Sequence, residues 1–448
     1  MQYLIALLNS SRLTAALFFI GTIAFWPGIY MSDTHSRWVD AEALLAIVGE
    51  GGTIANYLAP VMTVLLIPFL HFGIDPGFVL GSQAAAFFFA FRAFTKGNTV
   101  GTGWALLLAA LLPIHVLYFF FIVPDVWVLP LVMVLATVLV RAPNRSGVAV
   151  LTTAAACFLL FGFRPNAAVL IAPLLWIVWW TEWGRKVRAI ALSLAVALGL
   201  AASMFIPQWI GFAGKTNVAT GIVWEHIATL WMAEQMGVEI GPEYTLDFVG
   251  NTAQAVREHE FLTSDYLVWT AHPPFRAGHL VMEQDRILDR FKSLMLAHPG
   301  VYLRAKARII ACHLGYCGLL RQTVMSMYSQ PGSALPQGYQ GGNWLGDRIL
   351  AFSNFIATTD NVRHLYTPIL WIAAGALVMV SMRHSFSRQD WFAALLLTSY
   401  AASFAITSQA ASYRYLFPTV FFCVYVAAKA VLQKGCSRFK SRAAAEPG

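Results

Sequence analysis

The segment Met31-Ser32-Asp33-Thr34-His35-Ser36-Arg37-Trp38 directly follows the first long apolar run, residues 13–31. It places a carboxylate, Asp33, where the chain leaves a hydrophobic stretch long enough to cross a membrane. A charged group beside a membrane span is costly unless a partner or a function compensates it. This junction therefore predicts a membrane-embedded fold with a polar site at one face of the bilayer.

The composition is typical of polytopic membrane proteins. Of the 448 residues, 58% are hydrophobic and 12% are charged, whereas soluble proteins carry about 25% charged residues. Mean hydropathy is +0.62. The net charge of +8 comes from basic residues in short loops between apolar runs. Because orientation signals have this pattern, the basic charge does not indicate a nucleic-acid partner.

Ten apolar runs predict membrane-crossing helices, so the expected fold is an all-α polytopic bundle of ten to twelve such helices. The runs are residues 13–31, 77–91, 103–122, 125–140, 147–163, 167–182, 190–211, 366–382, 391–407 and 412–431. Several loops between them and the C-terminal tail are basic, which marks the cytoplasmic side. The segment 31–57 contains four acidic residues and one basic residue, and is expected outside.

Two further apolar stretches have two interpretations each. If 58–73 crossed the membrane, every later basic loop would lie on the wrong side, so we expect a juxtamembrane or re-entrant helix. A true crossing with one violating loop is the alternative. The basic segment 301–322 is expected along the outer surface as an amphipathic helix. Alternatively, it pairs with 346–358 as two short crossings.

The expected organisation has three parts. Residues 1–212 form a transmembrane module, residues 213–365 an extracytoplasmic region of helices and loops with interfacial or short membrane helices, and residues 366–448 the last spans and a basic cytoplasmic tail. The first apolar run lacks a small-residue cleavage site and is expected to be a retained span. Cys312 and Cys317 are five residues apart, a poor spacing for a disulfide on one helix, so unpaired thiols are expected.

Two carboxylates are candidates for chemistry at the outer face. Asp33 can remove the proton of an acceptor hydroxyl, or hold a metal that grips a diphosphate. The alternative is a solvated interfacial acid. Asp125 follows Pro124 at the start of the run 125–140, where an aspartate also complements the helix dipole. The functional interpretation is that it faces Asp33 across a cavity.

Two arginines lie outside in this topology and so depart from the positive-inside trend. Arg164 lies between the runs 147–163 and 167–182, and Arg414 lies at the start of the last run. A guanidinium offers a rigid fork of donors that suits phosphate, so the pair predicts a phosphate site for a membrane lipid. Snorkelling to lipid headgroups is the alternative. His35 and Arg37 are further candidates for contact with phosphate.

Several signatures of soluble enzymes are missing from the sequence. There is no glycine-rich phosphate loop, no Gly-x-Ser-x-Gly elbow and no His/Cys spacing typical of zinc sites. A nucleotide-binding active site is therefore not expected. The pattern favours a donor carried by a membrane lipid.

Six segments follow one another along the chain in an informative order. They are Met31-Ser32-Asp33, Leu58-Ala59-Pro60-Val61-Met62, Pro124-Asp125, Arg164-Pro165-Asn166, His298-Pro299-Gly300-Val301-Tyr302-Leu303 and Tyr413-Arg414-Tyr415. In this order they resemble the multi-pass GT-C-fold glycosyltransferases that use polyprenyl-phosphate sugars, especially the bacterial protein O-mannosyltransferase and aminoarabinose-transferase group. The resemblance covers roughly 13–190 and 290–432. It departs from the family where Asp33 has no adjacent second acid, and where Leu58-Ala59-Pro60 replaces His-Pro-Pro or Lys-Pro-Pro.

The resemblance implies a GT-C-like bundle with juxtamembrane helices, in the inner (plasma) membrane, with its site facing the periplasm. It implies transfer of a sugar from a polyprenyl phosphate or diphosphate to a glycan, lipid or protein acceptor. Asp33 would serve as the catalytic base and Asp125 as the second acid, while Arg164, Arg414 and Tyr413 would contact the donor. No metal ligand is assigned, and a divalent metal is left open.

Three other functions compete with this one. A transporter or flippase for lipid-linked sugars predicts charged groups at mid-span and repeated halves, whereas most charges here lie at span ends and no repeat is apparent. A polymerase or ligase of surface polysaccharide would share the arginines but would not need Asp33. An inactive scaffold is the third alternative.

Overall fold

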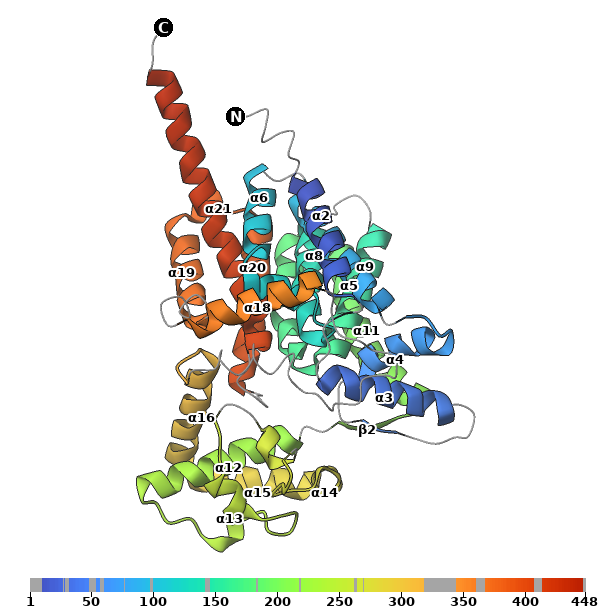
Figure 1. Ribbon diagram of the computed structural model, residues 1–448, viewed down its shortest axis with the longest axis vertical. Helices are drawn as coiled ribbons and strands as arrows, with labels where there is room; N and C mark the ends of the chain where they lie inside the picture. The colour runs from blue at the N-terminus through green and yellow to red at the C-terminus, as the bar shows by residue number, and fades with distance from the viewer. Residues whose placement is uncertain are drawn as a thin grey trace.

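The computed structural model describes most of the chain. The described residues are 10–26, 28, 32–47, 54–56, 60–75, 77–96, 100–141, 146–182, 184–216, 219–261, 264–268, 270–317, 344–359, 367–406 and 413–445. They form a helical bundle with a smaller helical unit beside one of its ends (Figure 1). We call residues 219–317 the polar unit, and the remaining helices form the bundle.

The bundle has one continuous apolar core. Its elements are α2 (Ser10–Ala24), α5 (Gly77–Thr95), α6 (Val100–Ala110), α7 (Pro113–Phe119), η1 (Pro124–Trp127), α8 (Val128–Arg141), α9 (Ser146–Phe163), η2 (Pro165–Leu170), α10 (Ile171–Thr181), α11 (Lys186–Ile210), α19 (Pro368–Ser381), α20 (Arg388–Ile406) and α21 (Tyr413–Ala445). The ring of Phe18 contacts Phe87 and Phe119 at centroid distances of 5.9 and 5.3 Å. Such close side-chain packing is a main source of attraction between helices in a membrane.

Four described helices are long and apolar enough to cross a membrane. They are Gly77–Thr95, Pro124–Arg141, Lys186–Ile210 and Arg414–Lys434. The pair Gly101–Ala110 and Pro113–Phe119 makes a fifth if the two are counted as one broken span. Shorter apolar helices of 10–17 residues are Ser11–Ala24, Pro60–His71, Gly147–Phe163, Pro165–Thr181 and Pro368–Ser381. The protein is therefore an α-helical polytopic membrane protein, but the described residues do not form ten equivalent long spans.

The run 103–122, expected as a membrane-crossing helix, is broken into two helices, α6 and α7. The helices on either side of the break are bent by 87°. Pro113 opens the second helix and has no N–H to continue the first, which favours a new helix at this residue. His115 Nδ1 lies 2.7 Å from the Ala109 carbonyl, so the imidazole satisfies a backbone group at the break.

Two other expected spans are also shorter or more polar than predicted. Within the run 13–31, α2 ends at Ala24 and the chain turns. The run 391–407 lies in α20, which opens with Arg388, Gln389 and Asp390 and is not among the long apolar helices. Asp390 forms a buried ion pair with Lys429 of α21 at 2.7 Å. The polar start of α20 therefore serves contact between helices.

Three described helices lie across the bundle instead of along it. In Figure 1, α3 (Ser32–Ile47), α4 (Pro60–His71) and α18 (Trp344–Thr358) run roughly crosswise to α2 and α8. The 12 residues of α4 span only about 18 Å, less than the hydrocarbon thickness. This agrees with the juxtamembrane helix expected for 58–73. The described part of 346–358 likewise does not run parallel to the spans.

Two short strands depart from the expected all-helical fold. β1 (Ile54–Asn56) and β2 (Phe212–Thr216) pair in parallel, with Ile54 opposite Phe212. The pairing joins the connection between α3 and α4 to the chain that follows α11. It therefore fastens the crosswise helices to the end of a long span.

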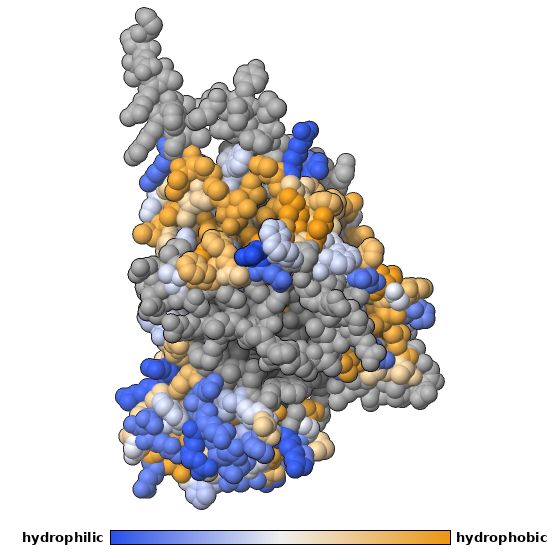
Figure 2. All heavy atoms as spheres, viewed as in Figure 1, coloured by the Kyte–Doolittle hydropathy of each residue, from blue (hydrophilic) through white to orange (hydrophobic). Residues whose placement is uncertain are grey.

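The polar unit has an apolar core of its own. Its helices are α12 (Ala219–Met236), α13 (Thr252–Arg257), α14 (Ala277–Met282), α15 (Gln284–Ala297) and α16 (Pro299–His313), with short η3 (Pro242–Tyr244) and η4 (Asp265–Leu267). Trp224 is fully buried and donates from Nε1 to the Glu260 carbonyl at 2.8 Å. A buried ion pair between Glu225 and Lys306 joins α12 to α16. Figure 2 shows hydrophilic residues gathered over this unit, in contrast to the apolar side chains on the bundle.

Cys312 and Cys317 form a disulfide, so the expectation of unpaired thiols is wrong for this pair. The expectation assumed that both residues would lie on one helix. Instead α16 ends at His313, and Gly315 adopts a φ of +99° that glycine tolerates best. The chain reverses there and brings the two Cα atoms to 4.7 Å.

The basic loops gather at the end of the bundle far from the polar unit, which we call the basic end. Arg141, at the end of α8, donates from Nη1 to the Ala93 carbonyl of α5 at 3.3 Å. Gln389, at the start of α20, donates to the Phe94 carbonyl at 3.3 Å and to Thr137 Oγ1 at 2.6 Å. The ends of three helices from distant parts of the chain therefore meet here.

Acidification is expected to destabilise the polar unit through His226. Burial lowers the pKa of this imidazole from 6.5 to about 4, while its hydrogen bond with the Tyr244 carbonyl opposes the shift. Between these values the unfolded chain binds more protons, so stability is lost as the pH falls from 6.5 toward 4. The loss for one histidine is about 1.4 kcal/mol per pH unit. Thermal unfolding of the full chain in detergent at a series of pH values measures it.

The variant His226→Gln is expected to make this pH dependence shallower, because it removes the titrating group. His279→Gln is the matched control, since His279 is exposed on the same unit. An identical pH dependence in wild type and His226→Gln would contradict the assignment.

Candidate functional site

Three of the charged residues singled out in the sequence lie together where the bundle meets the polar unit. Arg164 Nη2 is 2.9 Å from Asp125 Oδ1, and Arg414 Nε is 3.9 Å from Asp125 Oδ2. The three side chains come from η1, from the residue before η2, and from the start of α21. Only the fold brings these distant segments to one point.

A buried, non-helical stretch carries Asp125 into the site. After α7 the chain runs through residues 120–123, each fully buried, to the start of η1, and only the N–H groups of Phe120 and Phe121 bond back to α7. Gln83 of α5 donates from Nε2 to the carbonyls of Phe119 and Phe121, both at 2.8 Å. Backbone groups left without partners at membrane depth cost several kcal/mol each, which is why such a stretch requires protein donors. Gln83 therefore helps fix the position of the carboxylate.

Both arginines lie where helices begin. Pro165 follows Arg164 and opens η2, so Arg164 is extended, with φ −138° and ψ 94°. Tyr415 packs against both guanidinium groups, with its ring centroid 4.8 Å from Arg164 Cζ and 4.9 Å from Arg414 Cζ. The negative face of an aromatic ring attracts cations, so Tyr415 favours both guanidinium groups.

An aromatic layer backs the charged residues. The rings of Phe404 and Tyr415 stack at 4.9 Å with an interplanar angle of 9°. Tyr400 is fully buried, and its hydroxyl interacts electrostatically with the Arg164 guanidinium. His313, at the end of α16, contacts the rings of Phe404 and Tyr415 at 6.2 and 6.4 Å. Through His313 the polar unit reaches the bundle at this site.

His313 is neutral at pH 7. Burial lowers the pKa of its imidazole to about 4, and the charge of Lys306 lowers it further. A neutral ring adds no repulsion to the nearby guanidinium groups. The site therefore keeps its positive charge on the two arginines.

The three charged side chains differ in their access to solvent. The Asp125 side chain is 1% exposed, whereas those of Arg164 and Arg414 are 17% and 13% exposed. The carboxylate is therefore almost completely shielded from solvent, whereas part of each arginine side chain remains exposed. Asp125 is well placed to orient the arginines, and its role as a catalytic acid stays a prediction.

The remaining predicted site residues are placed only in part. The side chains of Asp33, His35 and Tyr413 lie outside the described residues, although their backbones belong to α3 and α21. Thr34 donates from Oγ1 to the Ile122 carbonyl at 2.5 Å. The first turn of α3, which includes Asp33, therefore lies against the stretch that leads to Asp125.

Arg37 is buried, with 2% of its surface exposed. Its charge interacts with Asp40, one turn further along α3. The sequence interpretation missed Tyr400 and His313 as neighbours of the arginines. The only available signal for either was a polar residue in an otherwise apolar stretch, and this does not identify its neighbours.

Among the described residues, no group of three or more His, Cys, Asp or Glu side chains is placed to bind a metal ion. Comparison with protein-family models, curated proteins and solved structures finds no match for this chain.

Replacement of Asp125 by alanine is expected to destabilise the protein by about 3–5 kcal/mol, because it leaves two largely buried guanidinium groups without their shared carboxylate. Unfolding of the full chain in detergent, followed by circular dichroism, measures the loss. Asp289→Ala is the control, since the Asp289 side chain is 80% exposed. Equal stabilities for the two variants would show that the ion pairs do not support the fold.

Proposed function

We propose that the protein is a membrane glycosyltransferase that moves a sugar from a polyprenyl-phosphate donor to an acceptor at the outer face of the plasma membrane. The observation that carries the proposal is the pair of arginines, Arg164 and Arg414, oriented by buried Asp125 at one end of the bundle. The resemblance to GT-C glycosyltransferases at these same positions adds support from the sequence.

The arginine pair suits the phosphate of a lipid-linked donor. Each guanidinium presents several N–H donors in a plane. Arg164 and Arg414 pair with Asp125, and Arg414 also donates from Nη2 to the Tyr415 hydroxyl at 3.0 Å. The outer edges of Arg164 and Arg414 remain partly exposed. A phosphate anchored in the membrane by its prenyl chain can approach these edges from the bundle surface. Binding at this point would hold the sugar beside the crosswise helix α3.

The proposed reaction assigns one role to each group. Asp33 accepts the proton of the acceptor hydroxyl, whose oxygen attacks the anomeric carbon of the donor sugar. The bond between that carbon and the phosphate oxygen breaks, and polyprenyl phosphate leaves with its electron pair. Arg164 and Arg414 stabilise the negative charge that develops on the leaving phosphate. Asp125 keeps both arginines in place during this step.

The proposed orientation puts the polar unit outside the cell. The gathered arginines of the basic end support a cytoplasmic location for that end. The disulfide between Cys312 and Cys317 supports an oxidising environment for the opposite end. Together these features support a site that faces the periplasm or exterior.

The competing transporter function has less support. A transporter is expected to carry charged groups near mid-span. The buried pair Asp390–Lys429 belongs to the start of α20, near the basic end. The function as polymerase or ligase shares the arginine pair and differs from our proposal in the acceptor.

Transfer from polyprenyl-phosphate sugars is expected to fall in two variants. Arg414→Lys keeps the charge and loses the planar fork, so transfer should drop by about tenfold to a hundredfold. Asp33→Asn removes the base and should lower transfer by about a hundredfold or more. The measurement is release of polyprenyl phosphate in membranes that contain equal amounts of folded protein.

Two matched variants control for charge loss in the same region. Glu42→Gln removes an exposed acid from α3, and Arg304→Gln removes an exposed arginine from α16. Both should transfer sugar at the wild-type rate. Unchanged transfer by Arg414→Lys and Asp33→Asn would rule out the proposed roles and favour a transporter or scaffold.

The orientation predicts how the cysteines react with a membrane-impermeant thiol reagent. In intact cells, Cys317, which is only partly buried, should be labelled only after reduction of its disulfide with Cys312. Cys436 in the tail should be labelled only after the membrane is opened. Cys157 is buried, and Cys157→Ser should leave both patterns unchanged. Labelling of Cys436 in intact cells would reverse the proposed orientation.

A further inference from the structure

A cavity of about 260 Å³ opens at the basic end, away from the site around Asp125. It lies between the end of α8, the turn that joins α10 to α11, and the start of α20. Its lining residues are Leu139, Val140, Thr181, Glu182, Gly184, Arg185, Arg188 and Arg388. Asp125 begins the same continuous helical stretch that ends near Leu139, so the two sites are roughly 20 Å apart along the helix axis.

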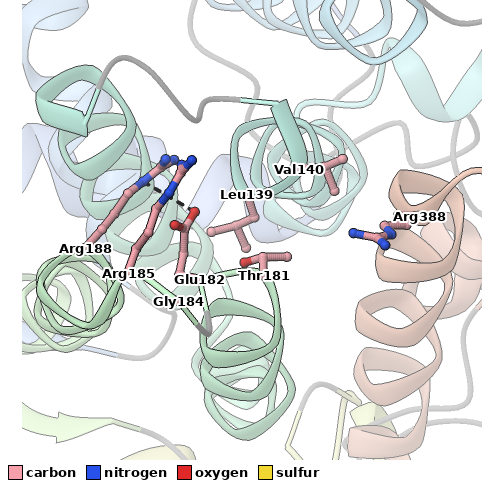
Figure 3. Close-up of a pocket in the computed structure, with 8 residues that line it drawn as sticks. All are labelled: Leu139, Val140, Thr181, Glu182, Gly184, Arg185, Arg188 and Arg388. Atoms are coloured by element: carbon pink, nitrogen blue, oxygen red, sulfur yellow. Dashed lines mark ion pairs between the residues drawn. The ribbon is translucent and has the colours of Figure 1, made fainter.

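Positive charge dominates the cavity lining. Three guanidinium groups face one carboxylate, so the lining carries a formal charge of +2. Figure 3 shows Arg185, Arg188 and Glu182 grouped on one wall, with Arg388 on the opposite side pointing toward the cavity. Arg188 Nε lies 3.4 Å from Glu182 Oε1, and both side chains are largely buried. Arg185 and Arg388 are exposed at the rim.

The arrangement of these side chains suits the binding of a compact anion. Arginines approach from two sides, and the buried Arg188–Glu182 pair fixes one wall. Guanidinium groups match the geometry of phosphate oxygens and bind them with charge-assisted hydrogen bonds. Thr181 also lines the cavity, but its hydroxyl donates to the Ile177 and Val178 carbonyls, so the arginines carry the recognition of the anion.

The level of the cavity points to a lipid headgroup. Trp179 and Trp180, immediately before the lining residues of α10, are 41% and 60% exposed. Exposed tryptophans at helix ends mark the boundary between headgroups and acyl chains. From that boundary α11 continues with exposed apolar side chains, among them Val187 at 83% and Leu194 at 57%. A phosphate in the cavity can therefore be joined to acyl chains that lie along α11.

We propose that this cavity binds the phosphate group of an anionic lipid in the leaflet at the basic end. Basic pockets between membrane helices are suited to such headgroups. The charge of +2 favours a lipid with two phosphates. Inorganic phosphate offers the same chemistry without the acyl chains. The site is independent of the proposed transferase function, because it shares no residue with the Asp125 cluster.

Native mass spectrometry of the full chain in detergent tests the proposal, with cardiolipin and phosphatidylcholine of matched acyl chains as the probes. Wild type should bind cardiolipin more tightly than phosphatidylcholine. Arg388→Gln and Arg185→Gln should each weaken cardiolipin binding by about tenfold, as expected for loss of one charge-assisted contact. Both arginines are exposed at the rim.

Arg383→Gln is the matched control, because this exposed arginine lies in the 3-10 turn Arg383–Ser385, just before Arg388 opens α20, and does not line the cavity. It should bind cardiolipin as wild type does. Equal affinities in Arg388→Gln and Arg383→Gln, or equal binding of the two lipids by wild type, would overturn the proposal. Competition by inorganic phosphate distinguishes the source: weak competition supports a lipid, and competition as strong as that of cardiolipin would overturn the lipid assignment.

Discussion

The ion pairs of Asp125 are the constraint on which this end of the bundle depends. A carboxylate removed from water at a membrane edge must be paired, since its desolvation costs several kcal/mol. Arg164 and Arg414 provide the pairing, and each brings the beginning of a different helical segment with it. The position of α21 relative to η1 and η2 therefore follows from electrostatics as well as from apolar packing.

Much of the surrounding structure follows from bringing Asp125 to this point. The break between α6 and α7 turns the chain, and the buried stretch 120–123, which is not part of a helix, then leads to η1. Such a stretch is tolerated inside a membrane protein only where protein groups replace water. Gln83 and Thr34 supply donors for its carbonyls from two different helices. Both the irregular backbone and its polar neighbours thus serve to place one carboxylate.

The sequence predicted features that depend on local chemistry better than those that depend on packing. Loop charge placed Arg164 and Arg414 at the same end of the bundle, and the structure pairs both with Asp125. Hydropathy did not predict the break within 103–122, because apolar residues continue through it. The disulfide was missed because it depends on a reversal after α16 that spacing alone does not reveal. Tyr400 and His313 become neighbours of the arginines only through tertiary packing.

The two arginine groups at opposite ends of the bundle use their carboxylates differently. Asp125 is shared by two arginines whose outer edges remain partly exposed, so the pairing fixes the direction of both forks. Glu182 pairs with buried Arg188, while Arg185 and Arg388 stay exposed at the cavity rim. A preorganised pair of forks suits a site where charge develops during a reaction, because little reorganisation is then required. Exposed rim arginines suit reversible contact with headgroups, because they are reached from the surface without opening the bundle. This difference in preorganisation supports the proposal of chemistry at the Asp125 cluster and of lipid binding at the cavity.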